Sequence, residues 1–460
     1  MLTGLLNVAS NTLVSGAVSL LQFTPTLQIT PATESVVAQP VLKTQNIGIL
    51  QGYIGVFVVA FLVTVLITPV VRRLAISNGI VDRPDDVRKQ HKMPIAYLGG
   101  VAVYAGILAG IIYSYFADSI PGLIDYHIVG EKNLVDGVFM PQVPPWIALG
   151  MTIIVVVGLI DDINGISARV KLGGQMMAAA ALAIGDVGVN VAEGVLRPTL
   201  GRLLDNPHLL YHIPLPFEVP GFGTTIEFDF IYWAGTVVIA IFVLGATNAS
   251  NFIDGLDGLL TGVTSIAMIG FLFIAAGMAI VDTGSFDGPR IIVGLAILGA
   301  CMGFLPHNFN PASIFLGDTG SLLLGYCSAL MILSLGDTGQ TSLVFAGLII
   351  YSIPIIDTLL AIIRRKLAGK KMSDPDADHL HHMLKRSLGV KGAVFALYGI
   401  GIVFCVLGVM ISKFQARFIY ALVLLVAFYI GVYAIKIARR SALEGHITSS
   451  DEKKAAKADS

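Results

Sequence analysis

Aspartates stand at the ends of several apolar runs in this sequence, where a carboxylate is costly to ionise unless something compensates its charge. Asp161 and Asp162 lie side by side directly after the apolar run 151–160. Further acids occupy comparable positions later in the chain: Asp254, Asp257, Asp318 and Asp357. If several of these carboxylates met on one side of a membrane, they could hold a divalent cation and a phosphate-bearing substrate. The pattern therefore predicts an enzyme.

The adjacent pair Asp161–Asp162 needs a positive partner, because two neighbouring carboxylates repel each other. Arg169 and Lys171 follow closely and could supply that charge. We therefore expect the two acids to be catalytic and Lys171 to bind substrate. For the pair alone, a solvated turn with a helix cap is an equally good interpretation.

Amides and acids recur at every third position, at Asn248, Asn251, Asp254 and Asp257. On a helix, residues three apart lie near one face, so the spacing predicts a polar stripe at the end of a membrane helix. Such a stripe suits a hydroxyl-rich or phosphate ligand. The competing interpretation is a helix cap followed by a turn, which explains fewer of the four side chains.

Asp318 is the predicted metal ligand. It stands between two glycines, in the segment that begins with His307 and Asn308 and precedes the next apolar run. A hard cation such as Mg²⁺ takes one or two protein carboxylates together with phosphate oxygens and waters. We expect Asp161 as the second carboxylate and Asn308 as a substrate-binding residue. A capped helix start is the alternative for Asp318.

Histidines and basic residues form two candidate phosphate-binding clusters. The later cluster contains His379, His381 and His382, whose imidazoles can face a phosphate. Zinc competes for it, but no cysteine lies nearby and hard acids dominate the other loops; a solvated helix face is the remaining alternative. The earlier cluster contains Lys89 and His91, which phosphate binding and the ordinary excess of cytoplasmic basic residues explain equally well.

The elements that must position these side chains are membrane helices. The chain has 460 residues, of which 55% are hydrophobic and 13% charged, whereas a soluble domain has about 25% charged residues. The net charge of −1 excludes a basic nucleic-acid-binding protein. The cysteines all lie in apolar runs and fit core positions rather than a disulfide or metal framework.

Apolar runs of about 20 residues predict an all-α, polytopic membrane protein with eleven transmembrane helices. The predicted spans are 47–71, 97–116, 144–160, 172–187, 229–247, 259–281, 290–306, 319–334, 341–363, 393–412 and 417–437. They form one domain, 47–440. The segment 1–46 is predicted to be extracytoplasmic or interfacial, and the polar tail 441–460 to be disordered.

Basic residues predict the orientation of the spans. Most lysines and arginines fall in the loops 72–96, 161–171 and 364–392 and in the C-terminal tail, which this span count places on one face. That face is then cytoplasmic and the N-terminus lies outside. The acidic loops 248–258 and 307–318 fall on the same face, so the polar clusters are expected to share one cytoplasmic site.

Five segments, in this order, resemble the polyprenyl-phosphate N-acetylhexosamine-1-phosphate transferases of glycosyltransferase family 4. They are 88–100, 161–162, 248–258, 308–321 and 379–382, and the match extends from about residue 50 to residue 437. The resemblance implies ten or eleven helices around a cytoplasm-facing active-site cleft in the inner (plasma) membrane. It also implies dependence on Mg²⁺, with Mn²⁺ as a substitute, and transfer of a sugar-1-phosphate from a UDP-sugar to a polyprenyl phosphate.

The resemblance also implies roles for individual residues. Asp318 matches the magnesium ligand of the family, and Asp161 and Asp162 match its essential aspartate pair. Two further groups match the polar residues on the nucleotide side and the histidine motif of the late cytoplasmic loop: Asn251, Asp254 and Asp257, and His379, His381 and His382.

The form His-Leu-His-His at 379–382 is similar to the WecA-like and teichoic-acid-initiating branch, which uses UDP-N-acetylglucosamine or a related sugar nucleotide. The phospho-MurNAc-pentapeptide transferases of peptidoglycan synthesis usually have three consecutive histidines, and Leu380 argues against them. The expected reaction gives polyprenyl-diphosphate-GlcNAc and UMP, as the first step of a cell-envelope glycan. A homodimer is compatible with the sequence.

An ion-coupled transporter is the rival from another class, because it would also carry ionisable residues in its membrane helices. Transporter acids tend to lie near the middle of the membrane in broken helices. Here they lie at span ends on one predicted face, and the sequence has no evident inverted repeat.

Overall fold

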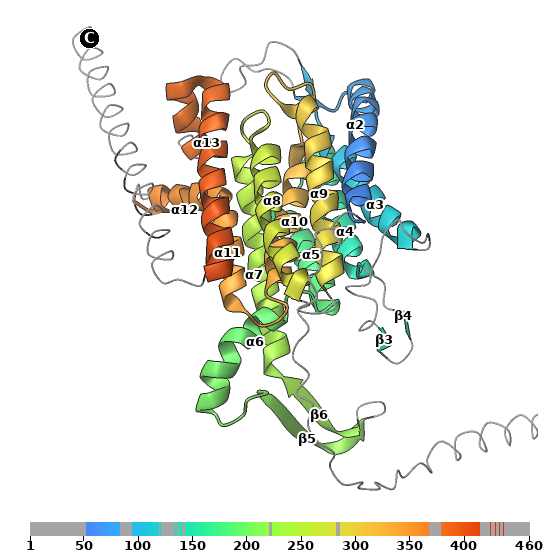
Figure 1. The fold of residues 1–460 in the computed structure, drawn as a ribbon, viewed down its shortest axis with the longest axis vertical. Coiled ribbons are helices and arrows are strands. Elements are labelled where there is room, and N and C mark those ends of the chain that lie inside the picture. Colours follow the sequence, from blue (N-terminus) through green and yellow to red (C-terminus); the bar gives the residue numbers. More distant parts are fainter. Residues whose placement is uncertain are drawn as a thin grey trace, which may run out of the picture. The chain divides into compact units, whose positions relative to one another are not determined.

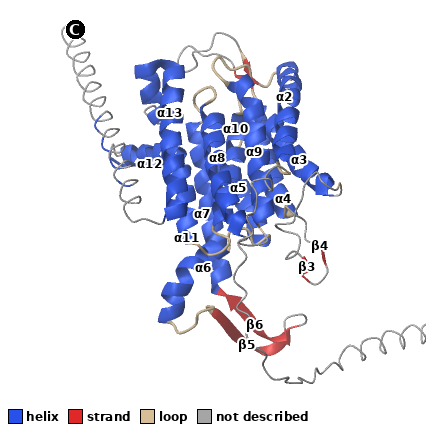
Figure 2. Ribbon diagram, in the orientation of Figure 1, coloured by secondary structure: helices blue, strands red, loops and turns tan. Residues whose placement is uncertain are grey.

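The computed structural model describes residues 52–82, 94–118, 120, 134–135, 138–139, 143–219, 223–281, 286–367 and 379–414, with 424, 428, 432 and 436. Within these ranges most residues belong to helices that run alongside one another (Figures 1 and 2). The predicted terminal segments 1–46 and 441–460 lie outside the described residues, as does almost all of the predicted span 417–437.

The helices follow the predicted apolar runs closely. In chain order they are α2 (Ile54–Ser77), α3 (Gly99–Asp118), α4 (Pro145–Asn164), α5 (Ala168–Ile184), α6 (Asn190–Leu196), α7 (Phe230–Ile253), α8 (Leu259–Val281), α9 (Asp287–Asn308), α10 (Gly317–Leu335), α11 (Thr341–Ile350), α12 (Ser352–Leu367) and α13 (Leu380–Phe414). Eight of the helices in the described ranges are long and apolar enough to cross a membrane, or nine if α11 and α12 count as one broken span. The prediction of an all-α, multi-pass membrane protein is confirmed, and the total of eleven spans stays a prediction.

The span predicted at 341–363 is broken rather than straight. Its halves, α11 and α12, meet at an angle of 76°, and α12 runs crosswise to the other helices in Figure 1. Pro354 lies in the first turn of α12, a position that tolerates its missing N–H, although the same residue could not continue α11. The hydropathy of the run could not reveal this bend, because both halves are apolar.

The helix α10 is the buried centre of the bundle. Every residue from Thr319 to Leu335 is buried, and the helix packs against α3, α4, α7 and α8. A helix that is apolar on all sides belongs in such a position. Because α10 begins at Gly317, its first turn places Asp318 in the middle of one end of the bundle.

Short strands join loops at both ends of the bundle. Strand β1 (Val81–Asp82) pairs antiparallel with β2 (Ile95–Ala96), and the carbonyl of Ala96 accepts a 2.8 Å hydrogen bond from the Phe315 amide just before α10. The hairpin of β5 (Leu210–Val219) and β6 (Gly223–Asp229) runs directly into α7. Since α7 ends beside Asp254, this hairpin and Asp254 lie at opposite ends of that helix.

The remaining small elements lie between α3 and α4 and between α6 and β5. They are the two-residue strands β3 (Leu134–Val135) and β4 (Val138–Phe139), which pair antiparallel, and a π-helical turn, η2 (Arg197–Gly201).

Candidate active site

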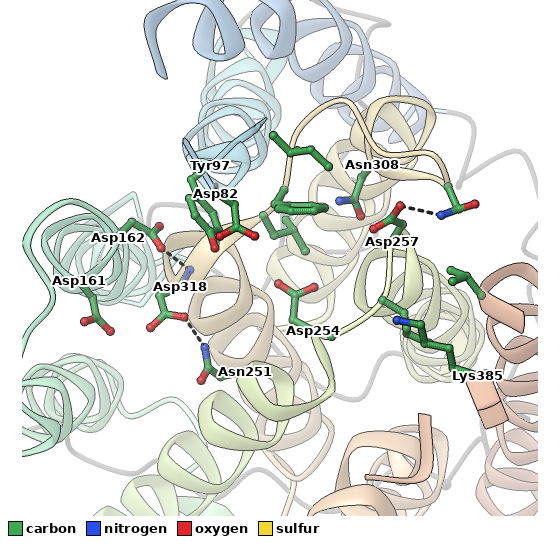
Figure 3. Close-up of a pocket in the computed structure, with 18 residues that line it drawn as sticks. Asp82, Tyr97, Asp161, Asp162, Asn251, Asp254, Asp257, Asn308, Asp318 and Lys385 are labelled. Carbon is green, nitrogen blue, oxygen red and sulfur yellow. Dashed lines mark hydrogen bonds between the residues drawn. The ribbon is translucent and has the colours of Figure 1, made fainter. Parts of the chain in front are cut away.

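Seven of the predicted polar residues meet in one cavity at the end of the bundle where α4, α7 and α9 finish and α10 begins (Figure 3). The cavity has a volume of about 670 Å³. The residues expected from the sequence that line it are Asp161, Asp162, Asn251, Asp254, Asp257, Asn308 and Asp318. The predicted convergence of these loops is therefore present in the structure.

Asp162 caps the first turn of α10 from the end of α4. Its Oδ1 accepts a 2.7 Å hydrogen bond from the Asp318 amide, and its Oδ2 accepts bonds from the amide and hydroxyl of Thr319 at 2.9 and 2.6 Å. A carboxylate at a helix N-terminus satisfies free amides and is favoured by the helix dipole. Since about four acceptor sites exist on a carboxylate, Asp162 has little capacity left for a ligand and acts mainly by fixing Asp318.

Gly317 makes this cap possible. Its φ is +71°, and a Cβ atom there would lie 2.5 Å from Oδ2 of Asp162. We expect Gly317→Ala to lower the free energy of unfolding by about 1–3 kcal/mol, because the residue would be strained and would displace the cap. Thermal unfolding of the detergent-solubilised protein measures the effect.

The matched control for that substitution is Gly173→Ala. Gly173 lies in α5, and a Cβ atom added to it would have none of the described atoms within 4 Å. Alanine should be neutral there or stabilise the helix by up to about 1 kcal/mol. Equal unfolding temperatures for the two variants would show that the cap is not sensitive to Gly317.

Lys171 lies between Asp161 and Asp318. Its Nζ is 3.0 Å from Oδ2 of Asp161 and also contacts Oδ2 of Asp318. Asn251 donates a 2.7 Å hydrogen bond to the other oxygen of Asp318, and the Ile166 amide donates a 2.9 Å bond to Asp161. Two carboxylates from different helices thus already share one cation, and the same pair fits the hard-oxygen preference of Mg²⁺.

The polar stripe predicted from Asn248 onwards is only partly helical. The helix α7 ends at Ile253, so Asp254 and Asp257 lie in the following turn, which contains two glycines, and not on the helix face. The prediction of one continuous helical stripe is therefore wrong. Asn248 lies one turn away from the cavity, where its Nδ2 donates a 3.0 Å hydrogen bond to Oε1 of Gln175.

Asp254 faces the cavity from this turn (Figure 3). Burial, followed by the negative charges of Asp318, Asp162 and Asp257, raises its pKa to about 8. At neutral pH Asp254 is therefore mostly protonated and can donate a hydrogen bond. A cation bound in the cavity would favour the ionised form of Asp254, and a bound phosphate would favour the protonated form.

Asp257 and Asn308 brace the loop between α9 and α10. Oδ2 of Asp257 accepts hydrogen bonds from Nδ2 of Asn310 at 2.8 Å and from the Ala312 amide at 3.1 Å. Asn308 accepts a 2.9 Å bond from Thr261 and donates a 3.1 Å bond to the Ile314 carbonyl. These contacts within the protein hold the cavity wall in place, so both residues have a structural role whether or not they also contact a ligand.

Three titratable residues that line the cavity were not singled out from the sequence: Asp82, Tyr97 and Lys385. Burial and the hydrogen bond to Asp82 raise the pKa of Tyr97 well above its ordinary value, so the phenol keeps its proton. Asp82 lies in the loop 72–96 after the first apolar run, and an acid in that loop was a usable signal. Lys385 carried no such signal, because its place on α13 beside the cavity depends on the fold.

The histidine motif lies beside the cavity wall. His379 and His381 are buried, and Nε2 of His381 faces Gly255, where a Cβ atom would lie only 2.5 Å from it. With His382 they form a cluster of rings, of which His381 and His382 are closest, with centroids 4.3 Å apart. The other predicted phosphate-binding residues, Lys89 and His91, lie outside the described residues.

The arrangement suits the binding of a diphosphate with a cation. Carboxylates from α4 and α10 lie on one side of the cavity, and Lys385 reaches it from α13 on another (Figure 3). Charges of both signs at one end of a set of membrane helices can neutralise an anionic ligand and orient it.

Comparison with known proteins gives a consistent picture. Residues 145–336 match the family model described as Glycosyl transferase family 4. A Bacillus subtilis (strain 168) protein named "Probable undecaprenyl-phosphate N-acetylglucosaminyl 1-phosphate transferase" is 30% identical over 362 residues, which cover 78% of this chain and 84% of that protein.

Two further relatives are named for different activities. A Mycolicibacterium smegmatis decaprenyl-phosphate N-acetylglucosaminephosphotransferase is 33% identical over 338 residues, covering 71% of this chain and 73% of its own. A Shouchella clausii phospho-N-acetylmuramoyl-pentapeptide-transferase is 28% identical over 371 residues, covering 77% and 95%. The similarity thus extends well beyond the residues around the cavity.

Proposed function

This chain belongs to glycosyl transferase family 4, and we propose that it transfers N-acetylglucosamine-1-phosphate from UDP-N-acetylglucosamine to a polyprenyl phosphate and releases UMP. Two relatives whose names specify N-acetylglucosamine are 30% and 33% identical to this chain. The relative whose name specifies the N-acetylmuramoyl-pentapeptide is 28% identical to it. Leu380, which interrupts the histidine motif, supports the same choice. The observation that carries the proposal is the meeting of Asp161, Lys171 and Asp318 at one end of the membrane helices.

The reaction is a phosphoryl transfer, for which an enzyme mainly supplies position and charge neutralisation. An oxygen of the lipid phosphate forms a bond to the sugar-linked phosphorus, and the bond from that phosphorus to the bridging oxygen breaks. The electron pair of the broken bond leaves with UMP. A phosphate monoester has its second pKa near 6, so the lipid phosphate is largely ionised and needs no strong base. An aspartyl-phosphate intermediate is the competing scheme.

Asp318 and Asp161 are the proposed ligands of Mg²⁺, for which Mn²⁺ can substitute. When bound, the cation neutralises charge on the diphosphate. Lys171 supplies a second positive charge at the same carboxylates. Asp254, whose pKa is raised to about 8 without a bound cation, can donate a hydrogen bond to a phosphate oxygen while it is protonated.

The membrane explains why such a site lies at the end of a helix bundle. The lipid phosphate reaches it from the bilayer, whereas the nucleotide sugar is soluble and comes from the aqueous side. We place that side in the cytoplasm, and the protein in the inner membrane with its N-terminus outside, because basic residues concentrate in the predicted loops of that face.

Purified protein with Mg²⁺, undecaprenyl phosphate and UDP-N-acetylglucosamine is expected to release UMP and form a lipid-linked sugar diphosphate. A parallel reaction with UDP-MurNAc-pentapeptide should give little or no UMP. The nucleotide is measured by chromatography and the lipid product by mass spectrometry. Turnover of the pentapeptide substrate alone would overturn the choice of sugar. Uptake of a solute by proteoliposomes, without UMP release, would instead support a transporter.

A further inference from the structure

Asp357 contacts the histidine motif from a different helix. It lies on α12 with only 1% of its surface exposed. Its Oδ2 is 2.9 Å from Nδ1 of His379, and its Oδ1 accepts a 2.6 Å hydrogen bond from the Leu380 amide. The same Oδ2 lies 3.4 Å from Nδ1 of His381, which is close but outside hydrogen-bonding geometry. One buried carboxylate thus touches three consecutive residues at the start of α13.

A buried carboxylate requires compensation, because transfer of an isolated charge from water is strongly unfavourable. Here the compensation comes from two imidazoles and from a backbone amide at the N-terminus of α13, where the helix dipole also favours an anion. Asp357 therefore joins the start of α13 to α12, just beyond the 76° bend that separates α12 from α11.

This contact orients the two rings beside the wall of the substrate cavity. Because both Nδ1 atoms lie on Asp357, the Nε2 edges lie on the other side of the rings. Nε2 of His381 faces Gly255, which lines the cavity. The rings of His379 and His381 are stacked with centroids 5.4 Å apart, so fixing one ring restricts the other.

We propose that Asp357 is a positioning residue: it holds His379 as an Nδ1–H donor, keeps Nδ1 of His381 on its own side of the ring, and thereby directs the Nε2 edge of His381 to the phosphates of the nucleotide sugar. This inference rests on the proposed function. Carboxylates that orient a metal-bound histidine through its second nitrogen act in this way, and their loss typically lowers metal affinity or activity about 10- to 100-fold.

A metal ion is the competing explanation, because Asp357, His379 and His381 offer ligand atoms within 4.8 Å of one another. The 2.9 Å separation of Oδ2 from Nδ1 of His379 is an ordinary hydrogen-bond length. In addition, Oδ1 is already occupied by a backbone amide. These contacts favour hydrogen bonding, and the metal content of the purified protein distinguishes the two.

The test uses the full-length protein and the variant Asp357→Asn. Asparagine can still accept a hydrogen bond from the Leu380 amide, but it presents an N–H₂ group where Oδ2 contacts the two imidazoles. We expect KM for UDP-N-acetylglucosamine to rise about 10- to 100-fold, while KM for undecaprenyl phosphate stays unchanged. A loss of folded protein would instead lower kcat without changing either KM.

Two further variants make the result specific. Asp357→Glu keeps the carboxylate and should recover most of the lost affinity, even if the asparagine variant folds poorly. Thr358→Val alters the next residue of α12, whose buried hydroxyl has no hydrogen-bond partner among the described residues, and should behave as wild type. In combination with His379→Gln, Asp357→Asn should cause less additional loss than it does alone, because both act through the same contact.

The outcomes separate this inference from the function on which it rests. An active wild type with an unchanged KM in Asp357→Asn would overturn the positioning role alone. Finding one zinc ion per chain in the purified wild type, and none in Asp357→Asn, would also overturn the positioning role. That result would make Asp357 a metal ligand. A wild type that releases no UMP would instead remove the proposed function.

Discussion

Asparagine in place of Asp318 is expected to reduce the rate of UMP release about a thousandfold while the protein stays folded. The carboxylate of Asp318 contacts Asn251 and Lys171, and the backbone amide of the same residue donates to Asp162. Asparagine has nearly the same shape and leaves the backbone hydrogen bond to Asp162 intact. The substitution therefore removes the charge that would hold a cation and leaves the cap of α10 in place.

The rate is best measured in a single turnover with both substrates saturating, so that product release does not mask the chemical step. Asp337→Asn is the matched control, because Asp337 follows the other end of the same helix. It should retain the wild-type rate. If Asp318→Asn turned over at the wild-type rate, Asp318 would not be the metal ligand.

Removal of divalent cations is expected to have an effect of similar size. Apart from Asp254, five carboxylates line the cavity and would repel a diphosphate. They are Asp82, Asp161, Asp162, Asp257 and Asp318. Lys171 contacts two of them and adds a single positive charge. Excess chelator should therefore lower UMP release about a thousandfold, and either Mg²⁺ or Mn²⁺ should restore it.

Chelator that has been saturated with Mg²⁺ beforehand provides the control, since it shows that the compound itself does not inhibit. Full activity in excess free chelator would exclude a metal-dependent reaction. It would leave Lys171 and the histidine motif as the groups that neutralise the diphosphate.

The helices could be predicted from the sequence because hydropathy depends on local composition. The run 259–281 coincides with α8, and the acids stood out because they lie in or beside apolar runs. Hydropathy could not reveal the break between α11 and α12, since apolar residues continue through it. Pro354 was the available signal, through its effect on the preceding turn.

The separate roles of neighbouring acids could not be predicted in the same way. Asp161 and Asp162 are adjacent in sequence but about 100° apart around the end of α4, so one meets Lys171 and the other caps α10. Likewise, Asp357 was visible as an acid in an apolar run. Its contact with His379 depends on how α12 packs against the start of α13.

Titration of the purified protein with Mn²⁺, followed by the EPR signal of the free ion and without substrates, tests the metal site most directly. We predict one binding site per chain in the wild type and in Asp337→Asn, and its loss in Asp318→Asn. Equal binding by all three proteins, or none by the wild type, would contradict a cation site formed by Asp161 and Asp318.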